Sequence, residues 1–203
     1  MKKLPNIYER LFPIRKFATI KEYFEHYVFE ENLDDLDEVL YDSNERKQWV
    51  NEYPNLGSFS NTLDYIKDEN SVPLLSVATE LSDVELCLPM NEVLFHSGNL
   101  PNGVSLFIGT EFKLKEIFSA TLDPYIAIVH DGEDDVYWYI QTKSENIRCL
   151  PVPDEFGEYE VIILGSPTAK IVDIISKRKN PMWLKNMSYK DPTDKTIVYI
   201  ELY

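Results

Sequence analysis

The heptapeptide Glu158-Tyr159-Glu160-Val161-Ile162-Ile163-Leu164 has the pattern of a β-strand that starts at a charged surface and enters a hydrophobic core. Side chains alternate along a strand, so Glu158 and Glu160 share one face with Ile162 and Leu164. Two carboxylates therefore lie together at the outer end of an apolar strand face. Their mutual repulsion tends to raise the pKa of one of them.

Such a pair of carboxylates has both a catalytic and a structural interpretation. At the rim of a cleft, one carboxylate can stabilise a developing cation or bind a sugar hydroxyl while the other manages a proton. Acidic residues at strand starts are also common without any catalytic role, and this chain has 35 Asp and Glu among its 203 residues. The order and spacing of the other elements must decide between the two interpretations.

Strands are predicted on both sides of this segment, and helices before it. Short runs rich in β-branched and aromatic residues predict strands at 92–97, 135–142, 170–175 and 196–202. Before Pro89 the apolar period is helical: Thr19 and Glu22 form a capping box, Ser43 caps a second helix, and Ser58 or Ser60 caps a third. We expect an α+β fold, with a helical N-terminal region over residues 1–88 and a β-rich core over residues 89–203.

Two further polar elements precede the carboxylates in the chain. His96-Ser97-Gly98 ends the strand predicted at 92–97, where a side chain can reach a ligand and a glycine lets that ligand approach the backbone. Ser119 and Thr121 follow about twenty residues later and share one strand face. A lone histidine is often structural, so His96 has a packing interpretation as well.

Composition bounds the partners and the compartment. The formal net charge is −15, which repels nucleic-acid backbones and anionic lipid at long range and suits a basic protein or a small ligand in a local pocket. Cys87 and Cys149 form no spaced pair and are expected to be buried thiols in a reducing compartment. The N-terminus has no secretory h-region and no run is long enough for a membrane helix, so we expect a cytoplasmic protein without a membrane partner. We expect no metal site.

Taken in order, the three polar elements resemble those of the mono-ADP-ribosyltransferases, an NAD-dependent superfamily of bacterial toxins, phage modifying enzymes and vertebrate ecto-enzymes. The resemblance covers roughly residues 90–178 and is strongest for the arginine-type branch, which carries a Glu-x-Glu pair. That branch has arginine where this chain has His96, whereas branches with histidine at that place lack the Glu-x-Glu pair. Ala120 also replaces a threonine of the family pattern. The sequence therefore combines features of two branches.

The resemblance implies a split β-sandwich with NAD in its cleft. Glu160 would bind the nicotinamide ribose and stabilise the oxocarbenium-like transition state, and Glu158 would orient and deprotonate the acceptor. His96, Ser97, Gly98, Ser119 and Thr121 would line the NAD site.

The family's substrate-recognition loop corresponds to residues 151–157, so the resemblance makes Phe156 a candidate acceptor contact, together with Tyr159. The same segment also fits a proline-rich surface turn. The glutamate at position 158 goes with arginine acceptors in this family.

The sequence leaves three functions open. The first is transfer of ADP-ribose from NAD to arginine in a basic protein, with release of nicotinamide. The second is transfer to nucleic acid, and the third is a catalytically degenerate member that binds NAD or a protein, motivated by His96. A phage enzyme acting in the host cytosol and a small intracellular toxin held by an antitoxin or inhibitor are equally compatible settings.

Overall fold

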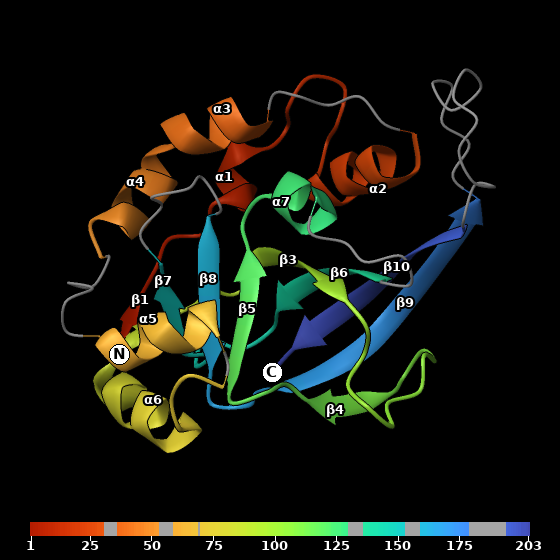
Figure 1. Ribbon diagram of the computed structural model, residues 1–203. Helices are drawn as coiled ribbons and strands as arrows, with labels where there is room; N and C mark the ends of the chain where they lie inside the picture. The colour runs from red at the N-terminus through yellow and green to blue at the C-terminus, as the bar shows by residue number, and fades with distance from the viewer. Residues whose placement is uncertain (31–35, 53–58, 69, 130–135, 153–158, 179–193) are drawn as a thin grey trace.

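A computed structural model describes residues 1–30, 36–52, 59–68, 70–129, 136–152, 159–178 and 194–203. Helices precede and flank one large mixed sheet, so the predicted α+β class is confirmed (Figure 1). The helices are α1 (Tyr8–Leu11), α2 (Ile20–Glu30), α3 (Leu36–Asp42), α4 (Asn44–Val50), α5 (Ser60–Lys67), α6 (Leu74–Glu80), the 3-10 turn η2 (Leu81–Asp83) and α7 (Pro124–Val129).

The described strands form an eight-stranded sheet with the order β4-β9-β10-β6-β3-β5-β8-β7, and a small parallel pair, β1 (Lys2–Lys3) with β2 (Leu86–Cys87). The strands of the large sheet are β3 (Val93–Gly98), β4 (Glu111–Lys113), β5 (Ile117–Thr121), β6 (Val136–Thr142), β7 (Cys149–Pro151), β8 (Glu160–Leu164), β9 (Thr168–Arg178) and β10 (Asp194–Leu202). Among them, β10 and β6 pair in parallel, and the other neighbours pair antiparallel.

The sheet is nearly divided between β3 and β5. These strands share one residue pair, Phe95 with Thr121, whereas β3 pairs with β6 over six residues and β5 with β8 over five. Figure 1 shows the consequence: β5, β7 and β8 run steeply, while β6, β9 and β10 cross below the helices in another direction. This narrow junction is the split that the resemblance implied for the sandwich.

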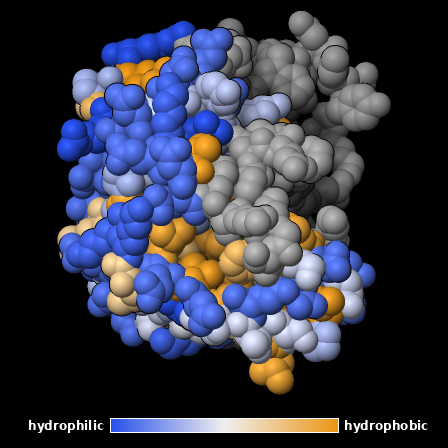
Figure 2. All heavy atoms as spheres, turned by 90° about the vertical axis from the view of Figure 1, so that its left-hand side faces the viewer, coloured by the Kyte–Doolittle hydropathy of each residue, from blue (hydrophilic) through white to orange (hydrophobic). Residues whose placement is uncertain are grey.

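The hydrophobic core joins the N-terminal helices to the sheet. One cluster contains Tyr8 and Phe24 from the helices together with Phe95 of β3 and Tyr139 of β6, and Phe24 and Phe95 have ring centroids 4.7 Å apart. A second, smaller cluster packs Val77 and neighbouring residues of α6 and η2 against β5, β7 and β8. Figure 2 shows the face on the left of Figure 1, where hydrophilic residues dominate around a strip of apolar ones.

The helix caps agree with the sequence at two places and differ at one. The Glu22 N–H donates to Thr19 Oγ1 at 3.2 Å and the Arg46 N–H donates to Ser43 Oγ at 3.1 Å, as the capping patterns predict. At α5, Ser60 is the first helical residue rather than a cap, and Ser58 lies outside the described residues. The carboxylate of Glu80 accepts from the N–H groups of Asn61 and Thr62 instead.

A buried carboxyl group joins the N-terminal segment to β3. Glu92 is fully buried, and its two oxygens accept from the N–H groups of Ile7 at 2.7 Å and Val93 at 3.1 Å. Burial raises the pKa of Glu92 to about 8, although these N–H donors act in the opposite direction. The side chain therefore holds a proton in the folded state at pH values where the unfolded chain has lost it.

Glu92 predicts a specific pH dependence of stability. An unfolded glutamate titrates near about 4.3, so folding takes up a proton between that pH and about 8. The contribution of Glu92 to the free energy of unfolding is then full below the lower value and declines as pH rises through the upper one. Glu92→Gln removes this titration, so the variant's melting temperature should fall less than the wild type's between pH 5 and pH 8.5. Parallel melting curves of the two proteins would contradict the assignment.

Candidate active site

Pairing of β5 with β8 brings Ser119 and Glu160 together. In this register Thr121 lies opposite Glu160 and Ser119 lies opposite Ile162, so both polar side chains project from the same face of the sheet. The Ser119 hydroxyl donates to Glu160 Oε1 at 2.6 Å, a diagonal contact between neighbouring strands. Ser119 is exposed and Glu160 is half-buried, so the pair is open to a ligand while Glu160 is held in one orientation.

The position of Glu160 is fixed by the residue before it. Tyr159 is 3% exposed, and its hydroxyl donates to Asp37 Oδ1 of α3 at 2.6 Å. The guanidinium of Arg46 in α4 lies 4.8 Å from the centre of the Tyr159 ring. The backbone of Tyr159 has a φ of 46°, a left-handed conformation that is unfavourable for a tyrosine and persists only where surrounding contacts impose it. Helices α3 and α4 therefore hold the start of β8 in place.

Thr121 shapes the turn that follows β5. It is buried, and its hydroxyl accepts from the N–H of Asp123 at 3.0 Å. The carboxylate of Asp123 in turn accepts from the N–H of Tyr125 at 2.8 Å and caps α7. The N–H of Leu122 donates to the carbonyl of Tyr159 at 3.0 Å, which ties this turn to the start of β8.

His96 packs among aromatic rings on the other side of β5. Its ring centroid lies 4.6 Å from that of Phe118 and 5.2 Å from that of Trp138. Phe118 and Ser119 are consecutive in β5, so they project from opposite faces of the sheet. The structure thus places the imidazole with the Phe118 side chain, and the expected contact between His96 and NAD stays a prediction.

Gly98 is required where it stands. Its φ is 146°, and a Cβ atom there would lie 3.0 Å from Nε2 of His96. Its carbonyl accepts from the indole N–H of Trp138 at 2.8 Å. Ser97, between these two residues, is half-buried and pairs with Tyr137 of β6. The end of β3 is therefore fixed by packing and hydrogen bonds before any ligand binds.

Two of the predicted site residues lie outside the described part of the chain. Glu158 and Phe156 belong to residues 153–158, so the predicted roles of both stay predictions. Tyr159 is described and contacts the chain's own helices, and its expected role in recognising the acceptor stays a prediction too. Asp37 and Arg46 carried no signal in the sequence, because a contact across 122 residues leaves no local pattern.

Comparison with known proteins finds similar structures but no similar curated sequence. No protein-family model matches the chain, and no curated protein sequence matches it. The structure is similar to the ADP-ribosylating component BECa of a binary enterotoxin of C. perfringens, crystallised with NADH, with 14% identity, a TM-score of 0.52, and 92% of this chain and 49% of that one covered.

Two further toxins share the fold. The enzymatic component C2-I of the Clostridium botulinum C2 toxin matches with 13% identity and a TM-score of 0.51, over 77% of this chain and 45% of that one. The Clostridium limosum C3 exoenzyme matches with 14% identity and a TM-score of 0.50, over 77% and 90% respectively. The chain spans about half the length of BECa and C2-I. At such identities the likeness shows the fold: this chain has the fold of the ADP-ribosylating toxins.

The packing of His96 generates a prediction that separates its two roles. Replacing the imidazole with a methyl group removes the contacts with Phe118 and Trp138, so His96→Ala should reduce the free energy of unfolding by about 1–3 kcal/mol. Thermal melting measures this loss, and calorimetric titration with NAD on the same sample measures affinity. An unchanged melting temperature together with weaker NAD binding would contradict the packing role and identify His96 as a cleft residue.

Proposed function

We propose that this protein is a mono-ADP-ribosyltransferase that transfers ADP-ribose from NAD to a macromolecular acceptor and releases nicotinamide. The observation that carries the proposal is the hydrogen bond from Ser119 to Glu160, formed across β5 and β8 in a chain with the fold of the ADP-ribosylating toxins. The fold supplies the context, and the pair supplies a carboxylate held in position and accessible from solvent.

The chemistry requires a fixed negative charge near the nicotinamide ribose. The bond between the anomeric carbon and the nicotinamide nitrogen breaks, and its electron pair leaves with nicotinamide. Positive charge develops on the ribose, and the carboxylate of Glu160 stabilises it as carboxylates do in glycoside cleavage. The Ser119 hydroxyl keeps that carboxylate oriented, so little reorganisation is needed when the charge appears.

Acceptor activation falls to Glu158 in this proposal. A nitrogen of the acceptor forms the new bond to the anomeric carbon and must lose a proton, and we assign the acceptance of that proton to the carboxylate of Glu158, two residues before Glu160 in the sequence. Phe156 and the loop around it would contact the acceptor. Arginine in a protein is the acceptor that Glu158 favours, and the net charge of −15 favours a basic protein over a nucleic acid.

Tyr159 is assigned a positioning role. The contacts of its buried side chain with Asp37 of α3 and Arg46 of α4 fix the backbone at Tyr159, and thereby the position of the neighbouring Glu160. The N-terminal helices thus support catalysis through the backbone of β8 rather than by touching NAD at this point. We further propose an intracellular acceptor in the cytosol, or the host cytosol if the chain is phage-encoded, and an antitoxin or inhibitor as partner if it acts as a toxin.

One observation favours a second candidate function, binding of NAD without transfer. His96 stands where the arginine-type branch has arginine, and its ring packs against Phe118 and Trp138. An imidazole in that position cannot bind a phosphate in the bidentate manner of a guanidinium. Measured turnover of NAD by the purified protein separates the two functions.

The central residue predicts the first test. Glu160→Gln keeps the side-chain volume and removes the charge, so transfer should fall by about 10²–10³-fold while the melting temperature stays close to wild type. The assay follows labelled NAD with mixed host protein and RNA as acceptors. Glu116→Gln makes the same charge change at the far end of the paired strands β5 and β8 and should leave transfer unchanged. Wild-type transfer by Glu160→Gln would remove Glu160 from the mechanism.

Glu158 gives a test that separates acceptor activation from NAD cleavage. A protonated guanidinium must lose a proton before it can attack, whereas water depends less on a general base. Glu158→Gln should therefore abolish transfer to protein, while nicotinamide release by hydrolysis continues within about threefold of wild type. Both rates are measured on one sample, by nicotinamide release and by label incorporation. A parallel loss of both would place Glu158 in NAD binding instead.

A further inference from the structure

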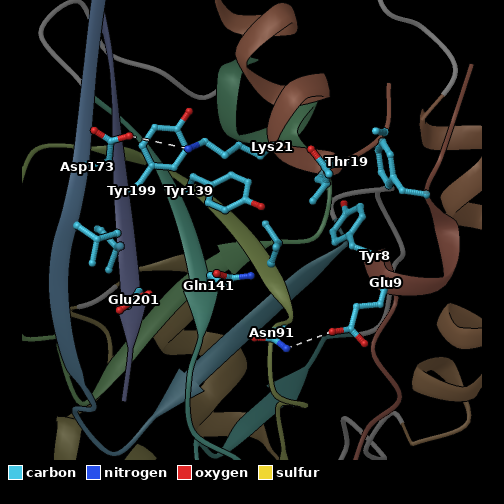
Figure 3. A pocket seen from close by; sticks show the side chains of 16 residues that line it. Tyr8, Glu9, Thr19, Lys21, Asn91, Tyr139, Gln141, Asp173, Tyr199 and Glu201 are labelled. Atoms are coloured by element: carbon cyan, nitrogen blue, oxygen red, sulfur yellow. Dashed lines mark hydrogen bonds and ion pairs between the residues drawn. The ribbon is translucent and has the colours of Figure 1, made fainter. Parts of the chain in front are cut away.

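A cavity of about 630 Å³ lies on the sheet between the N-terminal segment and strands β6, β9 and β10. Its walls include Tyr8 and Lys21 from the helical side and Tyr139 and Tyr199 from the strands, as Figure 3 shows. Neither Ser119 nor Glu160 is among the residues that line it. The volume is that of a pocket for a small organic molecule, and the pocket is separate from the candidate active site.

The aromatic floor of the cavity already binds a cation. The ammonium group of Lys21 lies 4.2 Å from the centre of the Tyr199 ring. The same ammonium nitrogen lies 3.8 Å from a carboxylate oxygen of Asp173 and 3.9 Å from one of Glu25. The Tyr199 hydroxyl donates to Glu25 at 2.7 Å, so the ring is held in place. The wall therefore provides the two features that favour a positive charge, an aromatic face and nearby carboxylates.

Carboxylates also line the end of the cavity away from Lys21. Glu9 and Glu201 both line it, and in Figure 3 they lie at its lower part, below Lys21. The carboxylate of Glu9 accepts a hydrogen bond from the neutral side-chain amide of Asn91 at 3.2 Å. The carboxylate of Glu201 forms an ion pair with the ammonium group of Lys143 at 3.6 Å. The carboxylates at the lining and beside it, Glu9, Glu25, Asp173 and Glu201, outnumber the ammonium groups of Lys21 and Lys143, and this excess of negative charge disfavours an anion and favours a second cation.

The hydroxyl of Tyr139 is available to a ligand in the cavity. Tyr139 is 7% exposed, and its side chain points from β6 into the cavity toward the helical side (Figure 3). Within the described residues this hydroxyl makes no hydrogen bond, and it is not among the fully buried polar atoms, so it is open to the cavity. Burial, then the charges of Glu92 and Glu25, raise the pKa of Tyr139, so the group stays a neutral hydroxyl that can accept from an N–H donor.

We propose that this cavity binds a small organic cation, an ammonium or amidinium group on an apolar or aromatic body. The apolar body packs against Tyr8, Val93 and Ile200, the charged N–H group donates to Tyr139, and Glu9 and Glu201 balance the charge. The site is independent of the proposed transferase activity, because it shares no residue with the Ser119–Glu160 pair.

Benzamidine and benzoate form a matched pair of probes for this site. They have the same ring and opposite charge, so binding of benzamidine alone isolates the preference for a cation. Titration of the full chain at low salt, followed by amide NMR shifts, should show benzamidine perturbing the amides of β6 and β10 around Tyr139 and Tyr199. Benzoate should leave those amides unperturbed at the same concentration.

Variants test the groups that carry the proposal. Tyr139→Phe retains the ring and removes the hydroxyl, so benzamidine affinity should fall about 3–10-fold. The double variant Glu9→Gln/Glu201→Gln should weaken benzamidine binding by about threefold or more. If Tyr139→Phe does not fold, this double variant alone tests the proposed site. Glu111→Gln, an exposed carboxylate on β4 outside the cavity, should bind as wild type does.

Three results would overturn the proposal. They are equal binding of benzoate, shifts that map to residues away from the cavity, and unchanged benzamidine affinity in the folded variants. The rate of nicotinamide release from NAD, measured on the same variants, should equal the wild-type rate, even if that rate is zero, because none of these residues belongs to the candidate active site. Failure of the transferase proposal is therefore distinguishable from failure of this one.

Discussion

The antiparallel pairing of β5 with β8 is the constraint on which the rest of the structure depends. These two strands take part in both hydrophobic clusters, since Phe118 and Ile163 face one of them and Ile117 and Ile162 face the other. The apolar alternation gives way to polar side chains where β5 ends and β8 begins. A slip of one residue would turn each of these side chains to the opposite face and separate Ser119 from Glu160.

The surroundings of β8 show how the N-terminal helices support the sheet. Tyr159, directly before the strand, has a left-handed backbone conformation that costs about 1 kcal/mol or more. Helices α3 and α4 supply the compensating contacts through Asp37 and Arg46. Glu92 anchors the segment before α1 to β3 in a similar way. The N-terminal helices are therefore packed into the same core as the strands, and they also enclose the cavity over Tyr139.

The sequence predicted what local patterns determine. Alternation identified β3, β6, β8, β9 and β10, and hydroxyl side chains identified the starts of α2 and α4, because periodicity and capping act within a few residues. Contacts between distant segments left no such signal. Glu80 caps α5 from a neighbouring helix, Asp37 holds Tyr159 across more than half the chain, and the fully buried Glu92 resembled any other strand-start carboxylate. The side on which His96 packs also depends on the aromatic neighbours that the tertiary fold supplies.

A crystal structure of the chain with bound NAD tests the central claim most directly. The account predicts the nicotinamide ribose on the face of β5 and β8 that carries Ser119, with a ribose hydroxyl within hydrogen-bond reach of Glu160, about 2.6–3.2 Å. The Ser119–Glu160 hydrogen bond should persist in that complex. NAD bound on another face, or in the cavity over Tyr139 and Tyr199, would contradict the assignment of this pair as the active site.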